Sequence, residues 1–184
     1  MAEASARMEG MKANGLTVRS AEPMQAAALR YFEVGGGFAR AVRDATGAAL
    51  PPVLTAVEAG AGELTLAWRS PTETLLLTPS AARLAQIEEQ LAGAGDGCLV
   101  NLTGGLKVLE VTGDRIADLL CRLGGTASVP APGEARRSRL ADVPVLSLAV
   151  RAGETLLVVD RGYAAYLTAW IRETLLDFPS SDGN

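Results

Sequence analysis

The sequence predicts an α+β protein built from two tandem ferredoxin-like units, each a split β-α-β arrangement with an antiparallel sheet. Two observations support this fold class. Short apolar runs alternate with helical stretches in the order β-α-β-β-α, and the same order occurs twice within the 184 residues. With 48% hydrophobic and 21% charged residues, the chain is also apolar enough to bury a core. Each sheet would carry its helices on one face and have an apolar face left to cover. The two sheets must therefore either merge into one or pack against each other.

The first unit is predicted over residues 16–103. Apolar and aromatic residues 29–34 indicate a strand, and the three glycines at 35–37 that follow are interpreted as a plain strand-to-helix turn because they lack phosphate-loop spacing. The remaining predicted elements are a helix over 38–46, strands over 64–68 and 73–78, a helix over 81–91 and a strand over 98–102.

The second unit is predicted over residues 104–178. Its first strand, 106–111, repeats the pattern of 29–34 at an offset of 77 residues. The predicted elements that follow are a helix over 115–123, a strand beginning at Val143, a strand over 154–158 that resembles 73–77, and a helix over 162–176. Outside both units, we expect residues 1–15 to form a flexible arm and residues 179–184 to form a C-terminal tail.

The composition excludes several classes of function. The chain has no histidine, which excludes catalysis by imidazole and the metal sites built on it. Its 17 Lys and Arg residues against 21 Asp and Glu give a net charge of −4, the wrong sign for nucleic-acid binding. No apolar run reaches the roughly 18 residues of a membrane span, and the N-terminus lacks a signal peptide. With only two cysteines, we expect a soluble cytoplasmic protein.

Several conspicuous side chains have ordinary structural interpretations. Cys98 and Cys121 lie in apolar stretches and are predicted to be buried hydrophobic side chains rather than nucleophiles. Tyr163, Tyr166 and Trp170 recur at helical spacing, so we expect them on a packed face of the last helix. No residue of the chain is predicted to be catalytic.

Three arginines form the one candidate binding site that the sequence offers. Arg136, Arg137 and Arg139 stand in a segment rich in proline and glycine, so we expect an exposed loop before the strand at Val143. Three guanidinium groups so close together could be simply solvated. They could also hold a partner's carboxylates or contact an anionic ligand.

From Leu64 onward, about two-thirds of the chain resembles the gamma subunit of heterotetrameric sarcosine oxidase. The likeness rests on the order and spacing of four motifs. These are the stretch from Trp68 to Leu77, the strand from Val108 to Asp114, the strand entry from Arg139 to Val145, and the stretch from Leu157 to Leu167 that leads to Trp170. Two features depart from the family pattern: Ser138 stands where a threonine is expected, and histidines are missing.

The resemblance implies a fold similar to the folate-binding domain of aminomethyltransferase. It also implies an enzyme complex that oxidises sarcosine to glycine, produces hydrogen peroxide and passes the one-carbon unit to tetrahydrofolate. In that family the alpha subunit carries NAD and the folate site, the beta subunit carries the flavins FAD and FMN, and a delta subunit binds zinc. The gamma subunit binds no cofactor, so no catalytic residue is carried over.

Our first hypothesis is therefore a non-catalytic gamma subunit of a sarcosine oxidase or a related flavin-dependent amine oxidase, with larger alpha and beta subunits as partners. The alternative is a stand-alone folate or small-anion binding protein of the same fold, in which the three arginines anchor a glutamate tail. A third hypothesis is a homo-oligomer with a regulatory role.

Overall fold

The structure, a computed structural model, describes residues 10–13, 15–21 and 23–178. Within these residues the chain forms an α+β fold with two antiparallel sheets, as the sequence predicts. The strands are β1 (Met11–Ala13), β2 (Leu16–Ser20), β3 (Gln25–Tyr31), β4 (Ala56–Ala59), β5 (Leu64–Ser70), β6 (Glu73–Thr78), β7 (Gly97–Asn101), β8 (Leu106–Gly113), β9 (Ala135–Leu140), β10 (Val143–Arg151) and β11 (Glu154–Asp160). The helices are α1 (Gly37–Thr46), α2 (Ala81–Leu91), α3 (Ile116–Gly124) and α4 (Arg161–Leu176), with 3-10 turns η1 (Gly60–Gly62) and η2 (Thr126–Ser128).

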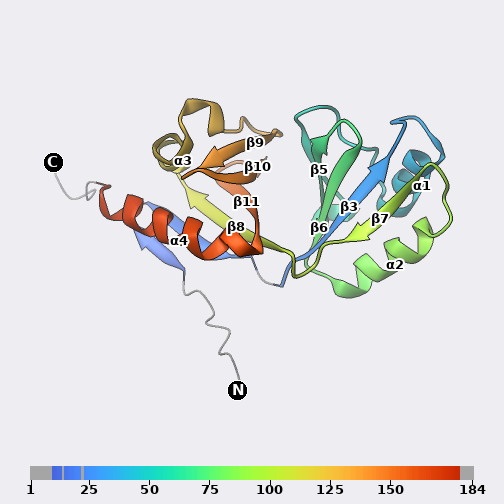
Figure 1. Cartoon of the computed structure of the whole chain (residues 1–184), viewed down its shortest axis with the longest axis horizontal. Helices are drawn as coiled ribbons and strands as arrows, with labels where there is room; N and C mark the ends of the chain where they lie inside the picture. Colours follow the sequence, from blue (N-terminus) through green and yellow to red (C-terminus); the bar gives the residue numbers. More distant parts are fainter. Residues whose placement is uncertain (1–9, 14, 22, 179–184) are drawn as a thin grey trace, which may run out of the picture.

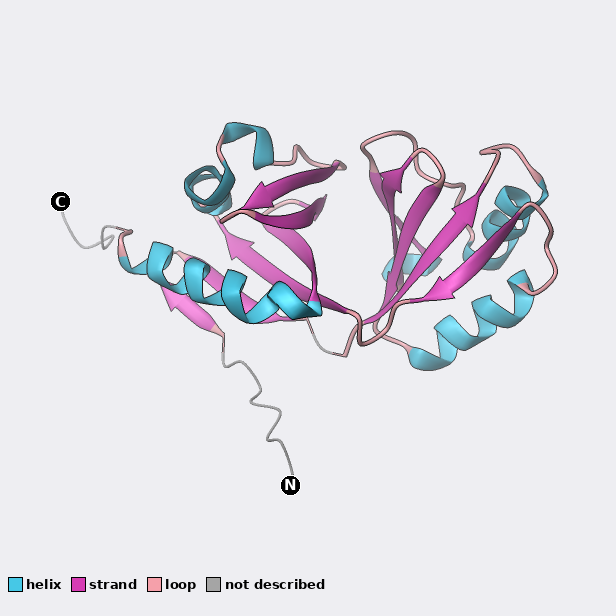
Figure 2. Cartoon of the chain, in the orientation of Figure 1, coloured by secondary structure: helices cyan, strands magenta, loops and turns pink. Residues whose placement is uncertain are grey.

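The two sheets repeat one strand order. The first runs β4-β5-β6-β3-β7, and the second runs β9-β10-β11-β8-β2 with β1 added beyond β2. Helices α1 and α2 lie on the outer face of the first sheet, and α3 and α4 lie on the outer face of the second (Figure 1). The layers therefore follow the order helix, sheet, sheet, helix, which Figure 2 shows by secondary structure.

Three buried clusters hold these layers together. One lies between the first sheet and its helices and includes Leu29, Phe38 and Ile87. A second lies between the second sheet and its helices and includes Leu109 and Ile171. The third cluster lies between the sheets and is formed by Ala26, Ala56, Ala67, Leu75, Leu77, Val108, Ala135, Leu146, Leu148, Leu156 and Val158. The sheets thus pack face to face, as the need to cover two apolar faces demands.

The backbone also joins the sheets at one pair of edges. The N–H of Ala56 in β4 donates to the carbonyl of Gly133 at 2.9 Å, and the N–H of Ala135 in β9 donates to the carbonyl of Leu54 at 2.9 Å. Leu54 adopts a φ of 60°, which is unfavourable for a side chain of its size. The edges formed by β4 and β9 therefore cover one another, at the cost of local backbone strain.

The N-terminal strand belongs to the second sheet, although the sequence suggests that the first unit begins at residue 16. Strand β2 pairs with β8 so that Leu16 lies opposite Gly113 and Val18 lies opposite Val111. It fills the position beside β8 that β7 fills beside β3. Leu16 and Val18 are buried in the cluster under α3 and α4, which explains why β2 joins the second sheet and not the first. Of the predicted arm, Met11–Ala13 form β1. The other parts of that prediction, residues 1–9 and 14, and the tail at 179–184 lie outside the described residues.

The first strand of the repeat is shifted from its predicted position. It spans Gln25–Tyr31 instead of 29–34, and Phe32 is 86% exposed. In the two hairpins Gln25 lies opposite Thr78 and Lys107 lies opposite Val159, so the true offset at this strand is 82 residues. Hydropathy underrates the three buried alanines at 26–28. Ala26 lies in the cluster between the sheets, whereas Ala27 lies in the cluster under α1 and α2.

Most other predicted elements are confirmed within one or two residues. The helices α1, α2, α3 and α4 and the hairpin β5-β6 lie where their apolar patterns place them. Strand β4 is an addition that the sequence did not reveal. Along the described residues, the helices are too short or too polar to traverse a lipid bilayer.

Candidate functional site

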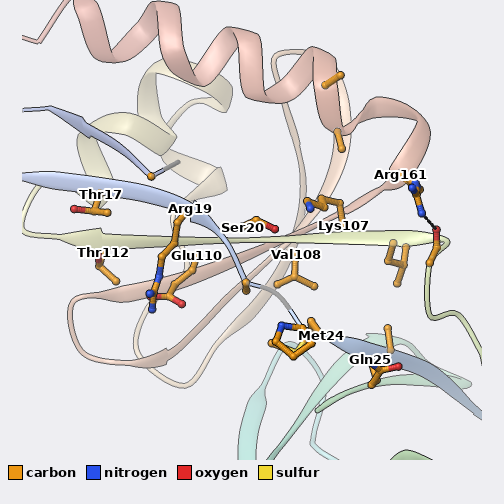
Figure 3. A pocket seen from close by; sticks show the side chains of 18 of the residues that line it. Thr17, Arg19, Ser20, Met24, Gln25, Lys107, Val108, Glu110, Thr112 and Arg161 are labelled. Atoms are coloured by element: carbon orange, nitrogen blue, oxygen red, sulfur yellow. Dashed lines mark hydrogen bonds and ion pairs between the residues drawn. The ribbon is translucent and has the colours of Figure 1, made fainter. Parts of the chain in front are cut away.

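A groove of about 1330 Å³ runs along β1, β2 and β8 of the second sheet and reaches the start of α4. Leu16 and Val18 in β2 point into the helix-side core, so the alternating Thr17 and Arg19 point to the opposite face. Glu110 in β8 lies on that same face (Figure 3). The groove therefore forms where β1, β2 and β8 carry polar side chains toward the inner side of the sheet.

Several charged side chains line this groove beside apolar and neutral polar ones. Arg19 donates from Nη2 and Nε to Oε1 of Glu110 at 2.6 and 3.0 Å, and this hydrogen bond raises the pKa of Arg19. Toward the other end, Arg161 donates to the carbonyl of Gly104 at 3.3 Å. Lys107 lies between these two pairs in Figure 3. The groove can bind a polar or acidic segment, but its side chains include no thiol or imidazole for proton transfer or nucleophilic attack.

Charged pairs continue from the groove across both sheets. Arg151 at the end of β10 forms an ion pair with Glu58 of β4 and approaches Glu154 of β11 at 4.0 Å. The hydrogen bond to Glu58 raises the pKa of Arg151, and the nearby charges of Glu154 and Glu110 add to the effect. Glu58, Arg151 and Glu154 thus place negative, positive and negative charges along one rim of the interface between the sheets. Each of these charges keeps access to water.

The three predicted arginines lie in strand β9, not in a loop. Residues Ala135–Leu140 pair with β10, and Arg136 lies opposite Ser147. Ala135 and Leu140 at the two ends of the strand are fully buried. The four residues between them are polar, so a hydropathy profile gives no indication of a strand. The loop expectation was wrong because strand pairing with β10 outweighs the low apolar content of the segment.

The arginines differ in what they can still bind. Arg136 donates to Glu134 at 2.8 and 3.4 Å, which raises the pKa of Arg136 and lowers that of Glu134. Arg139 donates to the carbonyl of Asp142. Arg137 is exposed and makes no hydrogen bond or ion pair with any residue that the structure describes.

A second, smaller groove brings two of these arginines together with charged residues of other strands. Its volume is about 380 Å³, and Arg137 and Arg139 line it with Arg69 and Asp160. Arg69 is already held by Glu73 at 2.8 Å. Arg137 is thus the guanidinium most available to a carboxylate from outside the chain.

Both cysteines are more exposed than predicted. Cys98 is exposed and Cys121 is half-buried. Cys98 lies in the edge strand β7 opposite Arg30, where only one neighbouring strand covers it. Within the described residues, no three His, Cys, Asp or Glu side chains are grouped closely enough to hold a metal ion.

The aromatic residues of α4 are also not packed as predicted. Tyr163 and Tyr166 are each 50% exposed and Trp170 is 48% exposed, while Leu167 and Ile171 on the same helix are fully buried. The spacing of the aromatics fitted a buried face, but the aliphatic residues one position further on take that face. Tyr166 and Trp170 meet edge to face, with ring centroids 6.4 Å apart.

The glycine turn before α1 is occupied from within the chain. The backbone N–H of Gly37 donates to Oδ2 of Asp96 at 3.2 Å. A carboxylate of the protein itself therefore sits at the start of this helix, where an anionic ligand would bind. The interpretation as a plain turn agrees with this contact.

Comparison with known protein families identifies the family of this chain. The model of the sarcosine oxidase, gamma subunit family matches residues 33–176. The chain belongs to the sarcosine oxidase gamma subunit family. Among curated proteins, the comparison found no significant match.

Two solved structures share the fold of this gamma-subunit family member. One is heterotetrameric sarcosine oxidase from Corynebacterium sp. U-96, with a TM-score of 0.80, 22% identity, and coverage of 96% of this chain and 91% of that chain. The other is the glycine cleavage system aminomethyltransferase T from Bartonella henselae, with a TM-score of 0.64 and 15% identity. That match covers 90% of this chain but 46% of the aminomethyltransferase. The expected likeness to the aminomethyltransferase fold is therefore confirmed.

Proposed function

We propose that the chain is the non-catalytic gamma subunit of a heterotetrameric sarcosine oxidase. The match of the family model over residues 33–176 is the observation that carries this proposal. In such a complex, the chain supports the oxidative demethylation of sarcosine to glycine and the transfer of the one-carbon unit to tetrahydrofolate. Its partners are the larger alpha and beta subunits, and the complex works in the cytoplasm.

The surface of α4 supports a role in assembly. Tyr163, Tyr166 and Trp170 stay half-exposed on one side of this helix. Large aromatic side chains are enriched at the centres of protein interfaces, where they supply apolar area and a polar edge. This aromatic face of α4 is a suitable contact for a larger subunit.

The arginines of β9 are proposed as a second contact. Arg137, which lacks an internal partner among the described residues, and Arg139 beside it can bind carboxylates of a partner or an anionic ligand. Arg136 contributes less, because Glu134 already occupies its guanidinium.

The flavins FAD and FMN, the NAD and the tetrahydrofolate are assigned to the partner subunits. The lining of the groove along β1, β2 and β8 supports this assignment. Among the residues that the structure describes, the lining contains no aromatic side chain against which an isoalloxazine, nicotinamide or pterin ring could stack, and Arg19 is neutralised by Glu110. The residues present therefore fit these cofactors poorly.

The second candidate is a stand-alone folate or small-anion binder, for which basic residues in the same groove could hold carboxylates such as those of a glutamate tail, although no aromatic side chain among its described residues stacks on the pterin ring. Lys12, Lys107 and Arg161 line the cavity together with the paired Arg19. Calorimetric titration of the isolated chain with folinate separates the two functions. Binding in the micromolar range would favour the second candidate, and no heat at millimolar folinate would remove it.

Co-expression tests the first candidate. The chain is expressed with the alpha, beta and delta subunits of a sarcosine oxidase, with an affinity tag on the alpha subunit. We expect the chain to be retained in stoichiometric amount, and sarcosine-dependent peroxide production to fall when its gene is omitted. A chain that elutes alone, with a fully active complex lacking it, would refute the proposal.

A further inference from the structure

Strand β7 is an edge of the first sheet that no other described strand covers. The sheet order ends at β7, which pairs only with β3 (Figure 1). The second sheet ends at the three-residue strand β1, which carries the charged Lys12 and is also uncovered among the described strands. The edges of β4 and β9 cover one another through the backbone bonds around Leu54 and Gly133, and β1 covers β2. An uncovered edge presents unpaired backbone donors and acceptors to any extended chain nearby.

The pairing register shows which backbone groups are free on this edge. The N–H of Leu102 donates to the carbonyl of Ala26 at 2.8 Å. In an antiparallel ladder the residues that bond to the neighbouring strand alternate, so the residues two and four positions before Leu102 also bond to β3. Those residues are Val100 and Cys98. In an antiparallel pair the alternate residues point their N–H and C=O groups away from the partner. The backbone groups of Gly97, Leu99 and Asn101 therefore point outward, away from β3.

The sequence of β7 carries none of the usual protection against edge pairing. The strand reads Gly-Cys-Leu-Val-Asn, without a charged residue or a proline. Beside it lies a cavity of about 590 Å³, lined by Tyr31, the exposed Phe32 and Cys98. The ion pair of Arg30 and Glu73 also lines this hollow. The edge thus combines an open backbone, to which an added strand can pair, with a neighbouring hollow that has aromatic and charged walls.

The internal repeat shows how such an added strand is seated. Leu99 lies opposite Leu29 in the first sheet, and Val18 lies opposite Val111 at the equivalent place in the second. Strand β2 is therefore the counterpart of β7. In the second sheet the outward groups of β2 are taken by β1, which runs antiparallel with Met11 opposite Val18. The equivalent seat on β7 is empty among the described residues.

We propose that the free edge of β7 binds an extended segment of a partner subunit, which adds to the first sheet as an antiparallel sixth strand. This inference rests on the proposed function, which supplies the partner. By analogy with β1, the segment carries apolar or small residues opposite Leu99 and Gly97, because Met11 and Ala13 pack against the helix-side core. The residue between them is polar, as Lys12 is.

A proline at Leu99 tests this docking with little effect on the sheet. The N–H of Leu99 takes no part in pairing with β3, so the Leu99→Pro variant removes an outward donor and leaves the existing ladder intact. Leu99→Ala is the matched control, since it removes the same half-buried side chain and keeps the N–H. Each variant is co-expressed with equal wild-type chain and the tagged partner subunits, and the ratio of the two in the purified complex is measured.

We expect Leu99→Pro to be depleted from the complex at least about tenfold, the factor that corresponds to about 1.4 kcal/mol, and Leu99→Ala to stay within about threefold of wild type. Equal incorporation of the proline and alanine variants would overturn the inference while the proposed function stands. If the wild-type chain itself fails to enter any complex, the proposed function falls and this inference falls with it.

Amide hydrogen exchange on the wild-type chain decides the matter if the proline variant does not fold. The N–H of Leu99 should exchange fast in the isolated chain and at least about a hundredfold slower in the complex, while Val100 is protected in both. Unchanged exchange on assembly would overturn the inference. So would slow exchange in the dilute isolated chain, which would mean that residues 1–9 or another part of the chain cover β7, or protection that grows with chain concentration, which would mean that a second copy does.

Discussion

Arg151 in β10 and Glu58 in β4 form an ion pair that ties the second sheet to the first. The hydrogen bond between them raises the pKa of Arg151. Both side chains remain open to water, with 53% and 35% exposure, so solvent screens the attraction. The pair joins the two sheets at this rim but adds little to the stability of the fold.

Replacing Arg151 by methionine should therefore cost little. We expect the free energy of unfolding to fall by about 0.5 kcal/mol, less in high salt. A double-mutant cycle with Glu58→Gln, measured by urea denaturation, gives the coupling between the two side chains. A coupling above about 2 kcal/mol would show that the pair is less screened than its exposure indicates.

Truncation in the core between the sheets should be far more damaging. Leu148 is fully buried there, and Leu148→Ala should lower the free energy of unfolding by about 2 to 5 kcal/mol. The control is Leu176→Ala at the end of α4, where the side chain is 74% exposed and the expected loss is below about 0.5 kcal/mol. Similar losses for both variants would contradict face-to-face packing of the sheets.

Gly113 is required for the close approach of β2 to β8. It adopts a φ of 131°, and a Cβ atom placed there would overlap the carbonyl of Gly15. Gly113→Ala should therefore displace β2 and lower the thermal midpoint by at least about 5 °C. Gly162→Ala in the first turn of α4, where a Cβ meets nothing within 4 Å, should be neutral or slightly stabilising. If the two alanine variants melt alike, β2 does not depend on this contact.

The pair of Glu134 and Arg136 should make part of the stability depend on acid pH. Hydrogen bonds from Arg136 and from the N–H of Ala131 lower the pKa of Glu134 below its ordinary 4.5. Because the folded-state pKa is depressed, the contribution is complete above pH of about 4.5 and is lost as pH falls through the folded value. Glu134→Gln should flatten this part of the stability profile, measured by denaturation at pH 3 to 6. An unchanged acid limb would contradict the assignment.

The aromatic face of α4 should matter for assembly and little for folding. Trp170→Ala should weaken retention of the chain by its partner subunits at least about tenfold, because a central aromatic in an interface commonly contributes that much. Its thermal midpoint should change little, since the side chain is 48% exposed in the isolated chain. Arg172→Ala on the same helix serves as the control. Equal retention of the two variants would place the interface elsewhere.

Local pattern was enough to predict the α+β class, the duplication and most elements. Helix α1 ends at Gly47 and helix α2 begins after Ser80, whose side chain accepts a hydrogen bond from the N–H of Arg83. Such boundaries depend on residues within a few positions of one another, so the sequence displays them directly. The family resemblance rests on the same local motifs and was confirmed.

The candidate contacts were less predictable from sequence. The sequence singled out Arg136, Arg137 and Arg139, but only the structure shows that Glu134 occupies Arg136 and that Arg137 has no partner among the described residues. The free edge at β7 could not be predicted from the sequence, because the residues of a strand do not show whether one or two other strands pair with it.

By itself, the sequence determined the four helices, most of the strands and the presence of two similar units, because these follow from apolar spacing along the chain. Only the tertiary structure decided that β2 joins the second sheet, that β9 is a strand and that the aromatics of α4 face outward. Each of these depends on contacts between residues far apart in sequence, where the competition for buried positions is settled by the whole fold.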